Sequence, residues 1–228
     1  MIAALRLVLL AAYLPLAHVA GTRHSPTLAV LALADLVLLV LIEPLLRRRI
    51  GAWLALAASA LLLIALMRSR FALMPLLLVP PLFTATVAVW FARSLRPGRE
   101  PLIAKVVSAL YAQSGMPLSP RHHSYTRQLT LAWALLLGLM TLVNLVLAMI
   151  AVPDGVLAQV GIAAPVTVSN AQWSLIANVG NYGLMGGFML AEFQFRKRVF
   201  AVRPYRNAFD FARRLAALGP AFWRDFFR

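Results

Sequence analysis

The sequence predicts an all-α fold, a polytopic membrane protein with about six transmembrane helices and further amphipathic helices in the cytoplasm. The first observation is composition: 62% of the 228 residues are hydrophobic and 13% are charged, whereas a soluble domain carries about 25% charge. The second is that several apolar runs approach the roughly 20 residues that span a bilayer as a helix. The third is that no run alternates with a period of two, which argues against a β-barrel.

Six apolar segments are the expected spans. A helix suits each of them because it satisfies its own backbone hydrogen bonds in lipid. They comprise residues 1–20, 27–46, 52–67, 71–92, 129–152 and 173–195. The third is short and the fourth contains three prolines, so this pair forms either two full crossings or a kinked hairpin that returns to the same side.

Four regions follow from this pattern. Residues 1–92 form a membrane region of two helical hairpins, and residues 93–128 form a basic cytoplasmic segment with an interfacial helix. Residues 129–195 contain the fifth and sixth spans with an external loop at 153–172, and residues 196–228 form a basic amphipathic tail. The first span also has features of a cleavable signal peptide, but the second span follows almost at once, which favours a hairpin.

Basic residues predict the orientation, because Lys and Arg accumulate on the cytoplasmic side of membrane proteins. Eighteen of them follow the second, fourth or sixth span, and Arg23, Arg68 and Arg70 fall on the other side. Both termini are therefore expected in the cytoplasm. The eighteen are Arg47, Arg48, Arg49, Arg93, Arg96, Arg99, Lys105, Arg121, Arg127, Arg196, Lys197, Arg198, Arg203, Arg206, Arg213, Arg214, Arg224 and Arg228.

The net charge of +15 is thus a polarised cytoplasmic surface. No nucleic-acid-binding motif accompanies it, so nucleic acid is not an expected partner. Anionic lipid headgroups attract basic residues by about 1 kcal/mol each near the surface, and this attraction explains most of the charge. An alternative partner is an acidic soluble protein, which would meet the largest internal basic group. This group, the basic face, comprises Arg93, Arg96, Arg99, Lys105, Arg121 and Arg127.

Two cytoplasmic segments are expected to form amphipathic helices. Residues 101–113 begin with proline, a common first position of a helix, and their apolar residues follow helical spacing. In the tail, Asn207 can cap a helix, which Gly219-Pro220 interrupts. The apolar stripe of the tail comprises Phe211, Leu215, Leu218 and Phe222. Aromatic residues beside arginines suit a membrane interface, so the tail either anchors the protein there or docks another protein.

Polar side chains inside apolar spans point to contacts within the bundle. An ionised group at a helix centre costs about 2.5–3.5 kcal/mol, so such groups usually face protein or water. One polar cluster at similar depth is expected from Asp35, Asn144, Asn178 and Asn181. It serves either as hydrogen bonds between helices or as a ligand or proton site. Glu43 lies near the cytoplasmic end of its span and is expected to pair with Arg6.

The sixth span contains small residues and one further ion pair. Gly183 and Gly187 have the spacing that lets two helix backbones approach closely, which favours helix packing over the alternative of a substrate groove. Glu192 and Arg196 are one helical turn apart and are expected to form a structural ion pair.

Catalytic patterns are scarce in this sequence. The absence of cysteine excludes thiol nucleophiles, cysteine metal ligands and disulfides. His122 and His123 are the only adjacent histidines, and neighbouring residues face different directions on a helix. They are the only candidates for a catalytic role, no acidic residue lies near them in the sequence, and neither a metal nor another cofactor is expected.

Three stretches of the chain carry a resemblance to known proteins. They are RSLRPGREPLIAK, YTRQLTLAWALLLGLMTLVNLVLA and WSLIANVGNYGLMGGFMLAEFQFRKRVF, followed by the tail PYRNAFDFARRL. Together they resemble a small family of bacterial inner-membrane proteins encoded among the genes for aryl polyene and xanthomonadin-type pigments. The resemblance runs from about Phe91 to the C-terminus, and the first ninety residues share only hydropathy. Members are sometimes labelled ketosynthase, but that activity needs a cysteine nucleophile, which this chain lacks.

The resemblance implies a role beside enzymes that build conjugated acyl chains on acidic acyl carrier proteins. The leading hypothesis is an accessory protein that brings a carrier protein or a partner acyltransferase to the membrane through the basic face. A second hypothesis is a transporter or flippase for the pigment lipid, with Asp35 and the asparagines along its path. A third is a membrane enzyme of acyl or glycosyl transfer that uses His122 or His123.

Overall fold

The predicted helical class is confirmed by the computed structural model, which is 79% helical. The structure describes residues 2–200 and 204–226, without the side chains of residues 3, 178, 208 and 220. Arg203 and Arg228, which entered the charge count, lie outside this description. Within it, five helices are long and apolar enough to cross a membrane. They are α1 (Ile2–Arg23), α2 (Pro26–Leu46), α3 (Ile50–Met67), α4 (Met74–Ser94) and α6 (Pro120–Ile150).

The segment expected as a sixth span is not among these five helices. It forms α8 (Asn170–Ser174), the π-helix η1 (Leu175–Gly180) and α9 (Asn181–Val199) in succession. Asn181 explains the π-helix locally, because its side chain donates to Ala177 O at 2.8 Å while its backbone N–H donates to Ile176 O. A polar side chain thus takes the carbonyl that the α-helical backbone would use.

The start of α6 differs most from the sequence expectation. The helix begins at Pro120, well before the expected first residue of the span, Leu129. The added residues are polar, so the apolar pattern does not extend to them. His122 accepts from the backbone N–H of Ser119 at 3.2 Å, as Glu or Gln does three residues after the N-cap in a capping box. This bond satisfies a donor at the helix start and explains why the helix extends beyond its apolar part.

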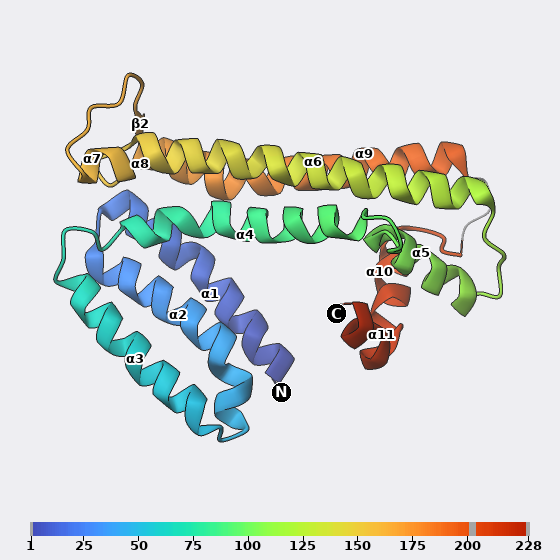
Figure 1. The fold of residues 1–228 in the computed structure, drawn as a ribbon, viewed down its shortest axis with the longest axis horizontal. Coiled ribbons are helices and arrows are strands. Elements are labelled where there is room, and N and C mark those ends of the chain that lie inside the picture. The colour runs from blue at the N-terminus through green and yellow to red at the C-terminus, as the bar shows by residue number, and fades with distance from the viewer. Residues whose placement is uncertain (1, 201–203, 227–228) are drawn as a thin grey trace. The chain divides into compact units, whose positions relative to one another are not determined.

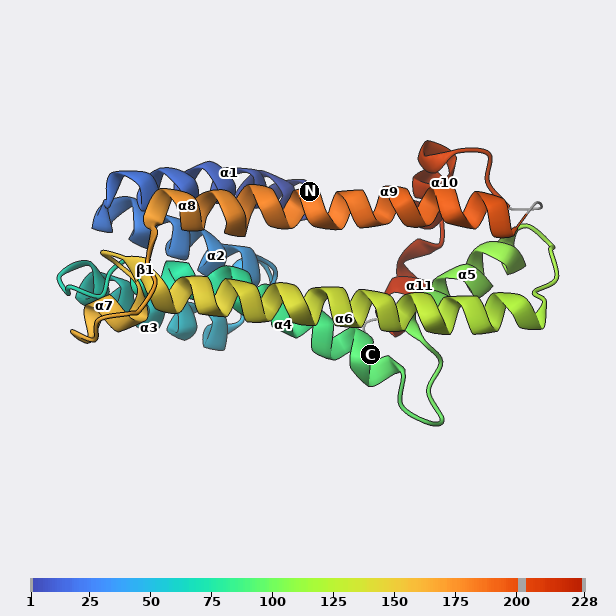
Figure 2. The same cartoon turned by 90° about the horizontal axis from the view of Figure 1, so that it is seen from above.

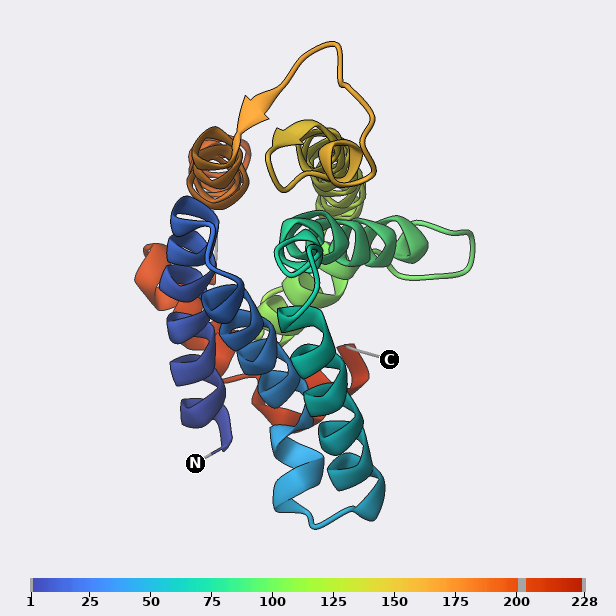
Figure 3. The same ribbon diagram turned by 90° about the vertical axis from the view of Figure 1, so that its left-hand side faces the viewer.

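The chain forms two compact units, which do not coincide with the four regions expected from the sequence. Unit 1 comprises Met1–Leu82 and Leu142–Leu184. Within it, α1, α2 and α3 lie alongside one another (Figures 1 and 3). The contact between α1 and α2 is made by small residues, because α1 contributes Ala17 and Ala20 and α2 contributes Ala29 and Ala32, all buried.

A short parallel bridge holds the loop between α6 and α8 in unit 1. Strand β1 (Ala151–Val152) pairs with β2 (Val168–Ser169), and α7 (Val156–Gln159) lies between them in sequence. Trp173 of α8 is buried against Leu147, Ala148 and Ala151. Figure 2 shows α8 beside α1, and the ring of Trp173 would lie 3.8 Å from a Cβ at Gly21. The loop therefore packs on the helices of unit 1.

Unit 2 comprises Phe83–Thr141 and Met185–Arg228. Its apolar core joins Ala88 of α4 to Leu137 and Met140 of α6. It also contains α5 (Leu102–Gln113), α10 (Ala208–Ala216) and α11 (Gly219–Phe226). Helices α5 and α10 lie side by side (Figure 1), and Phe226 of α11 packs edge-on against Trp90 of α4 with ring centroids 5.2 Å apart.

The amphipathic stripes of α5 and α10 pack against the chain itself. Leu102 and Leu110 of α5 are buried. Phe211 of α10 is half-buried and meets Tyr205 edge-on with centroids 5.0 Å apart. Part of each stripe therefore packs within unit 2, and the placement of these helices at a membrane interface stays a prediction. The exposed aromatic residue of α10 is instead Phe209.

Candidate functional site

His122 of α6, a catalytic candidate from the sequence, has both ring nitrogens occupied. Nδ1 lies 3.2 Å from the backbone nitrogen of Ser119 and 2.8 Å from its Oγ, and Nε2 lies 2.9 Å from Tyr111 Oη. A backbone N–H can only donate, so Nδ1 accepts and the neutral ring carries its proton on Nε2. This bonding assigns His122 a structural role at the helix start.

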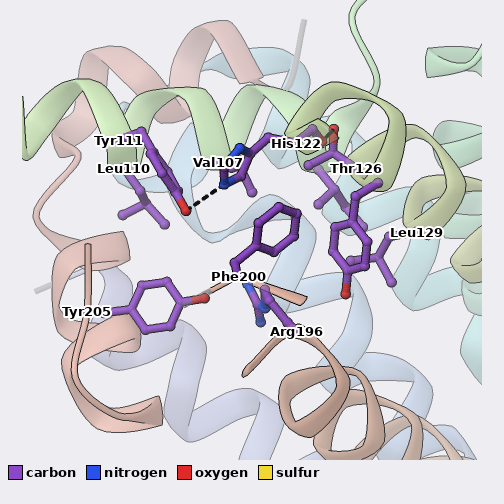
Figure 4. A pocket seen from close by; sticks show the side chains of 11 residues that line it. Val107, Leu110, Tyr111, His122, Thr126, Leu129, Arg196, Phe200 and Tyr205 are labelled. Carbon is purple, nitrogen blue, oxygen red and sulfur yellow. Dashed lines mark hydrogen bonds between the residues drawn. The ribbon is translucent and has the colours of Figure 1, made fainter. Parts of the chain in front are cut away.

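The surroundings of His122 leave space for only a small molecule. Its ring stacks on Phe200 with centroids 4.1 Å apart. The adjoining cavity of unit 2 has a volume of about 20 Å³, enough for about one water molecule. Figure 4 shows His122, Tyr111, Phe200 and Arg196 around it. His123 is exposed, and the described residues contain no group of three or more His, Cys, Asp or Glu side chains suited to a metal.

Glu192 and Arg196 of α9 form the ion pair expected from their spacing, and they also bind residues that the sequence did not suggest. Glu192 Oε2 lies 2.9 Å from Arg196 Nη2, and Glu192 Oε1 accepts from Tyr125 Oη at 2.8 Å. The Arg196 guanidinium lies over the rings of Tyr205 at 5.5 Å and Phe211 at 5.3 Å. These contacts join the end of α9 to α6 and α10 within unit 2.

The basic face lies on the surface of unit 2. Five of its residues are exposed, and Lys105 on α5 is half-buried. None of the six belongs to an ion pair within residues 2–200 and 204–226. Arg127 Nη2 donates to Leu95 O at 3.2 Å, and Glu100, the only acid in this segment, accepts from Ser108 at 3.2 Å. The exposed residues are Arg93, Arg96, Arg99, Arg121 and Arg127.

The expected intramembrane cluster forms only in part. Asn181 Nδ2 donates to Asn144 Oδ1 at 3.0 Å, and both side chains are buried. Asp35 is also buried, but the described structure shows no hydrogen bond from it to either amide, and its Oδ2 has no partner there. The side chain of Asn178 lies outside the described residues. The two asparagines are therefore hydrogen-bonded to each other, and the described structure shows no bond from either of them to Asp35.

Glu43 lies where the sequence placed it, near the end of α2. Its Oε2 is 3.0 Å from Arg6 Nη2, and its Oε1 is 2.7 Å from Arg47 Nη2. Arg47 is thus a second partner that the sequence analysis did not name.

Gly183 and Gly187 were expected to pack against another helix, but the described structure shows no such contact. A Cβ built on either glycine meets nothing within 4 Å, so no described part of the chain packs closely there. Both residues are exposed on α9. Within the described residues, no helix makes use of the spacing that permits close approach.

A polar cluster in unit 1 was not predicted from the sequence. His24 Nδ1 lies 2.9 Å from Asp154 Oδ2, and Asn170 Nδ2 donates to the same oxygen. On the same side of α8, Ser174 Oγ lies 2.8 Å from His18 Nδ1. A lone acid in the external loop and two histidines near the end of α1 were visible in the sequence, but only the fold brings them together.

No protein-family model matches this sequence, and no curated protein or solved structure is significantly similar to it. The link to an aryl polyene pathway therefore stays a prediction from the resemblance. The charges and hydrogen bonds within each unit are the basis for choosing among the functions that this resemblance suggests.

Proposed function

We propose that the protein is an accessory protein of the bacterial inner membrane that recruits an acidic acyl carrier protein, or a partner enzyme, of an aryl polyene or xanthomonadin-like pathway. The observation that carries the proposal is the basic face of unit 2, whose five exposed arginines have no carboxylate partner in the described structure. Such a surface attracts an acidic protein because its positive potential is not neutralised from within the chain.

The framework beneath the basic face supports this role. The Ser94 hydroxyl accepts from the backbone N–H of Leu102 at 3.1 Å, and Thr130 Oγ1 accepts from that of Ile103 at 3.4 Å. These bonds attach the start of α5 to α4 and α6, which carry Arg93, Arg121 and Arg127, and so fix both ends of the loop that carries Arg96 and Arg99. A charged surface on connected helices keeps its arrangement, which favours a specific encounter over diffuse attraction.

The proposal includes six spans with both termini in the cytoplasm. Five candidate helices are present in the described residues, and the continuous run from α8 to α9 would be the sixth crossing. Its polar residues Asn181 and Glu192 both have partners in the structure, which lowers the cost of placing them in lipid. Reporter fusions at the C-terminus test this topology, and a periplasmic signal would contradict it.

The binding test uses the full chain in nanodiscs of neutral lipid with purified acyl carrier protein. Two exposed arginines of the basic face are replaced in the variant Arg96→Gln/Arg99→Gln. The matched control, Arg48→Gln/Arg49→Gln, removes two exposed arginines that the topology places on the same side of the membrane. We expect at least tenfold weaker binding for the first variant and less than twofold for the control, with salt weakening the wild type. Equal affinity of all three proteins would reject recruitment through this face.

A second candidate function is transfer of the pigment lipid across the membrane, and Asp35 favours it. An ionisable group inside a membrane span marks a functional site more often than an ionisable group in a soluble protein does. The Oδ2 atom of the buried Asp35 carboxyl has no partner in the described structure. Asp35→Asn should then abolish appearance of pigment in the outer leaflet while synthesis continues. Unchanged transfer would remove this candidate.

The third hypothesis, acyl or glycosyl transfer at His122 or His123, has less support. His122 would have to break one of its two ring hydrogen bonds before it could take up a proton. The double variant His122→Gln/His123→Gln tests the hypothesis through pigment formation in cells, since a transferase that uses either ring would lose its product.

A further inference from the structure

A groove in unit 2 lies at the point where α6, a candidate membrane span, changes from polar to apolar. It has a volume of about 360 Å³ and is lined by Leu95, which follows α4, and by Ser124, Arg127, Gln128 and Leu131 of α6. The three polar residues precede the apolar part of α6, and Leu131 lies within it. The groove therefore combines a charged end and an apolar end on one helix.

Arg127 supplies the groove with a positive charge that no acid neutralises. Its side chain is exposed and belongs to none of the ion pairs within residues 2–200 and 204–226. Nη2 donates to Leu95 O at 3.2 Å, which holds the guanidinium at the wall of the groove and leaves other N–H groups of its planar fork for a ligand. The Ser124 hydroxyl and the Gln128 amide, both exposed, add donors of the kind that phosphate oxygens accept from.

An exposed row of leucines continues from the groove along α6. Leu131, Leu135 and Leu139 follow Ser124 and Gln128 at intervals of three or four residues, so all five lie on one face of the helix. The three leucines are 48%, 65% and 58% exposed, whereas the opposite face of α6 packs on α4. In a membrane span, lipid chains cover such an exposed apolar face. Because Leu131 also lines the groove, the polar site and the leucine row are continuous.

We infer that this groove binds the headgroup of an anionic glycerophospholipid, whose phosphate is held by Arg127, Ser124 and Gln128 and whose acyl chain lies along the leucine row. A guanidinium suits phosphate because its fork donates to two oxygens at once. Arg96, which follows Leu95 and is exposed, adds positive charge and favours a net negative headgroup over a zwitterionic one. Basic pockets between membrane-spanning helices on the cytoplasmic side are typical sites for such headgroups.

The inference rests on α4 and α6 as membrane spans, which the proposed function includes, but not on recruitment of a carrier protein. The recruitment test is made in neutral lipid with changes at Arg96 and Arg99, so its result and the result of the lipid test are independent.

The test uses the full chain in detergent micelles and native mass spectrometry, which separates the protein from its complex with one lipid molecule. The probes are phosphatidylglycerol and phosphatidylcholine with the same acyl chains. We expect the wild type to bind phosphatidylglycerol about tenfold more tightly, since hydrogen bonds to charged groups are the stronger ones. Arg127→Gln keeps a donor but removes the charge, and it should reduce this preference to about twofold. Arg213→Gln removes an exposed arginine of α10 that also lacks an ion-pair partner in the described structure, and it should keep the preference.

Two further measurements separate a specific site from general attraction to basic residues. Ser124→Phe places a ring in the groove and leaves every arginine and the Arg127–Leu95 bond in place. It should also reduce the preference, and it tests the site even where loss of that bond destabilises the Arg127 variant. Inorganic phosphate in molar excess should not displace bound phosphatidylglycerol, because it has no chain to lie along the leucine row.

Three results would overturn the inference. Equal binding of the two lipids by the wild type would leave Arg127 to an acidic protein partner of the basic face. Equal loss of the preference in Arg213→Gln and Arg127→Gln would show diffuse attraction. Displacement by inorganic phosphate would show that the groove binds the anion without the lipid.

Discussion

Tyr125 Oη donates a 2.8 Å hydrogen bond to Glu192, a residue far along the chain on another helix. The carboxylate also holds Arg196 at 2.9 Å, and the guanidinium in turn lies over Tyr205 and Phe211. The bond therefore belongs to a network that connects α6, α9 and α10 of unit 2. Replacing single members of this network tests how much of the stability of unit 2 depends on it.

Tyr125→Phe removes the hydroxyl and leaves the Glu192–Arg196 pair in place. A hydrogen bond to a charged group contributes about 1.5–3 kcal/mol, so the free energy of unfolding should fall by about that amount. Unfolding by sodium dodecyl sulfate in mixed micelles measures the change. Tyr182→Phe is the control, because Tyr182 is 54% exposed and its hydroxyl should contribute little. Equal effects of the two changes would contradict the importance of the bond.

Glu192→Gln removes the charge that balances Arg196. The arginine side chain is only 14% exposed. Removing one partner of a buried ion pair lowers the free energy of unfolding by about 3–5 kcal/mol, because the other charge remains without compensation. The same unfolding measurement should show this loss. Glu192→Gln/Arg196→Met should recover part of it, since no buried charge then remains. A double variant less stable than the single one would show that the rings around Arg196 depend on its charge.

Gly155→Ala should disturb the loop between α6 and α8. An added Cβ would lie 2.2 Å from Ala151 O, so the backbone must move and the β1–β2 bridge should loosen. Amide hydrogen exchange at Val168 and Ser169 reports this change. Gly138→Ala in α6 is the matched control, because its Cβ meets nothing within 4 Å and alanine is favoured over glycine in a helix by about 0.5–1 kcal/mol. Unchanged exchange in Gly155→Ala would show that the loop accommodates the methyl group.

Acidification should loosen α10. The backbone N–H of Arg206 and then the side chain of Arg214 hold the pKa of Asp210 below its ordinary value. A carboxyl whose pKa is lower in the folded state stabilises that state above the unfolded pKa, near 3.9, and this contribution is lost as pH falls through the folded value. Amide exchange of residues 208–216, corrected for intrinsic rates at pH 6 and pH 3, should show reduced protection at pH 3. Asp210→Asn should show no such dependence.

Span positions were the part of the fold that the sequence predicted best. The second span, expected at 27–46, corresponds to α2 (Pro26–Leu46), because Ser25-Pro26 and Arg47 provide start and stop signals beside a largely apolar run. α6 extends beyond its apolar part because the Ser119–His122 contact supports a polar helix start. A hydropathy pattern carries no information about such a cap.

Contacts between distant residues were less predictable. Depth along a span suggested that Asp35 joins Asn144 and Asn181, but depth does not fix the direction in which a side chain points around a helix axis. The stripe of α10 was recognised, yet a stripe does not reveal whether lipid or the chain covers it. Asp154 and Asn170, which bind each other beside His24, lie within two positions of the β1–β2 bridge, and two-residue strands leave no periodic pattern in the sequence.

The alanine contact between α1 and α2 has a consequence for how this hairpin tolerates change. Ala17, Ala20, Ala29 and Ala32 allow the two backbones a close approach, and in a bilayer such proximity, through dispersion forces, is what holds helices together. Replacing any of these alanines with glycine would remove only one methyl group from the contact. Replacing one of them with leucine would separate the two helices along their length. A larger side chain, more than a polar one, is therefore the substitution to which this hairpin is most sensitive.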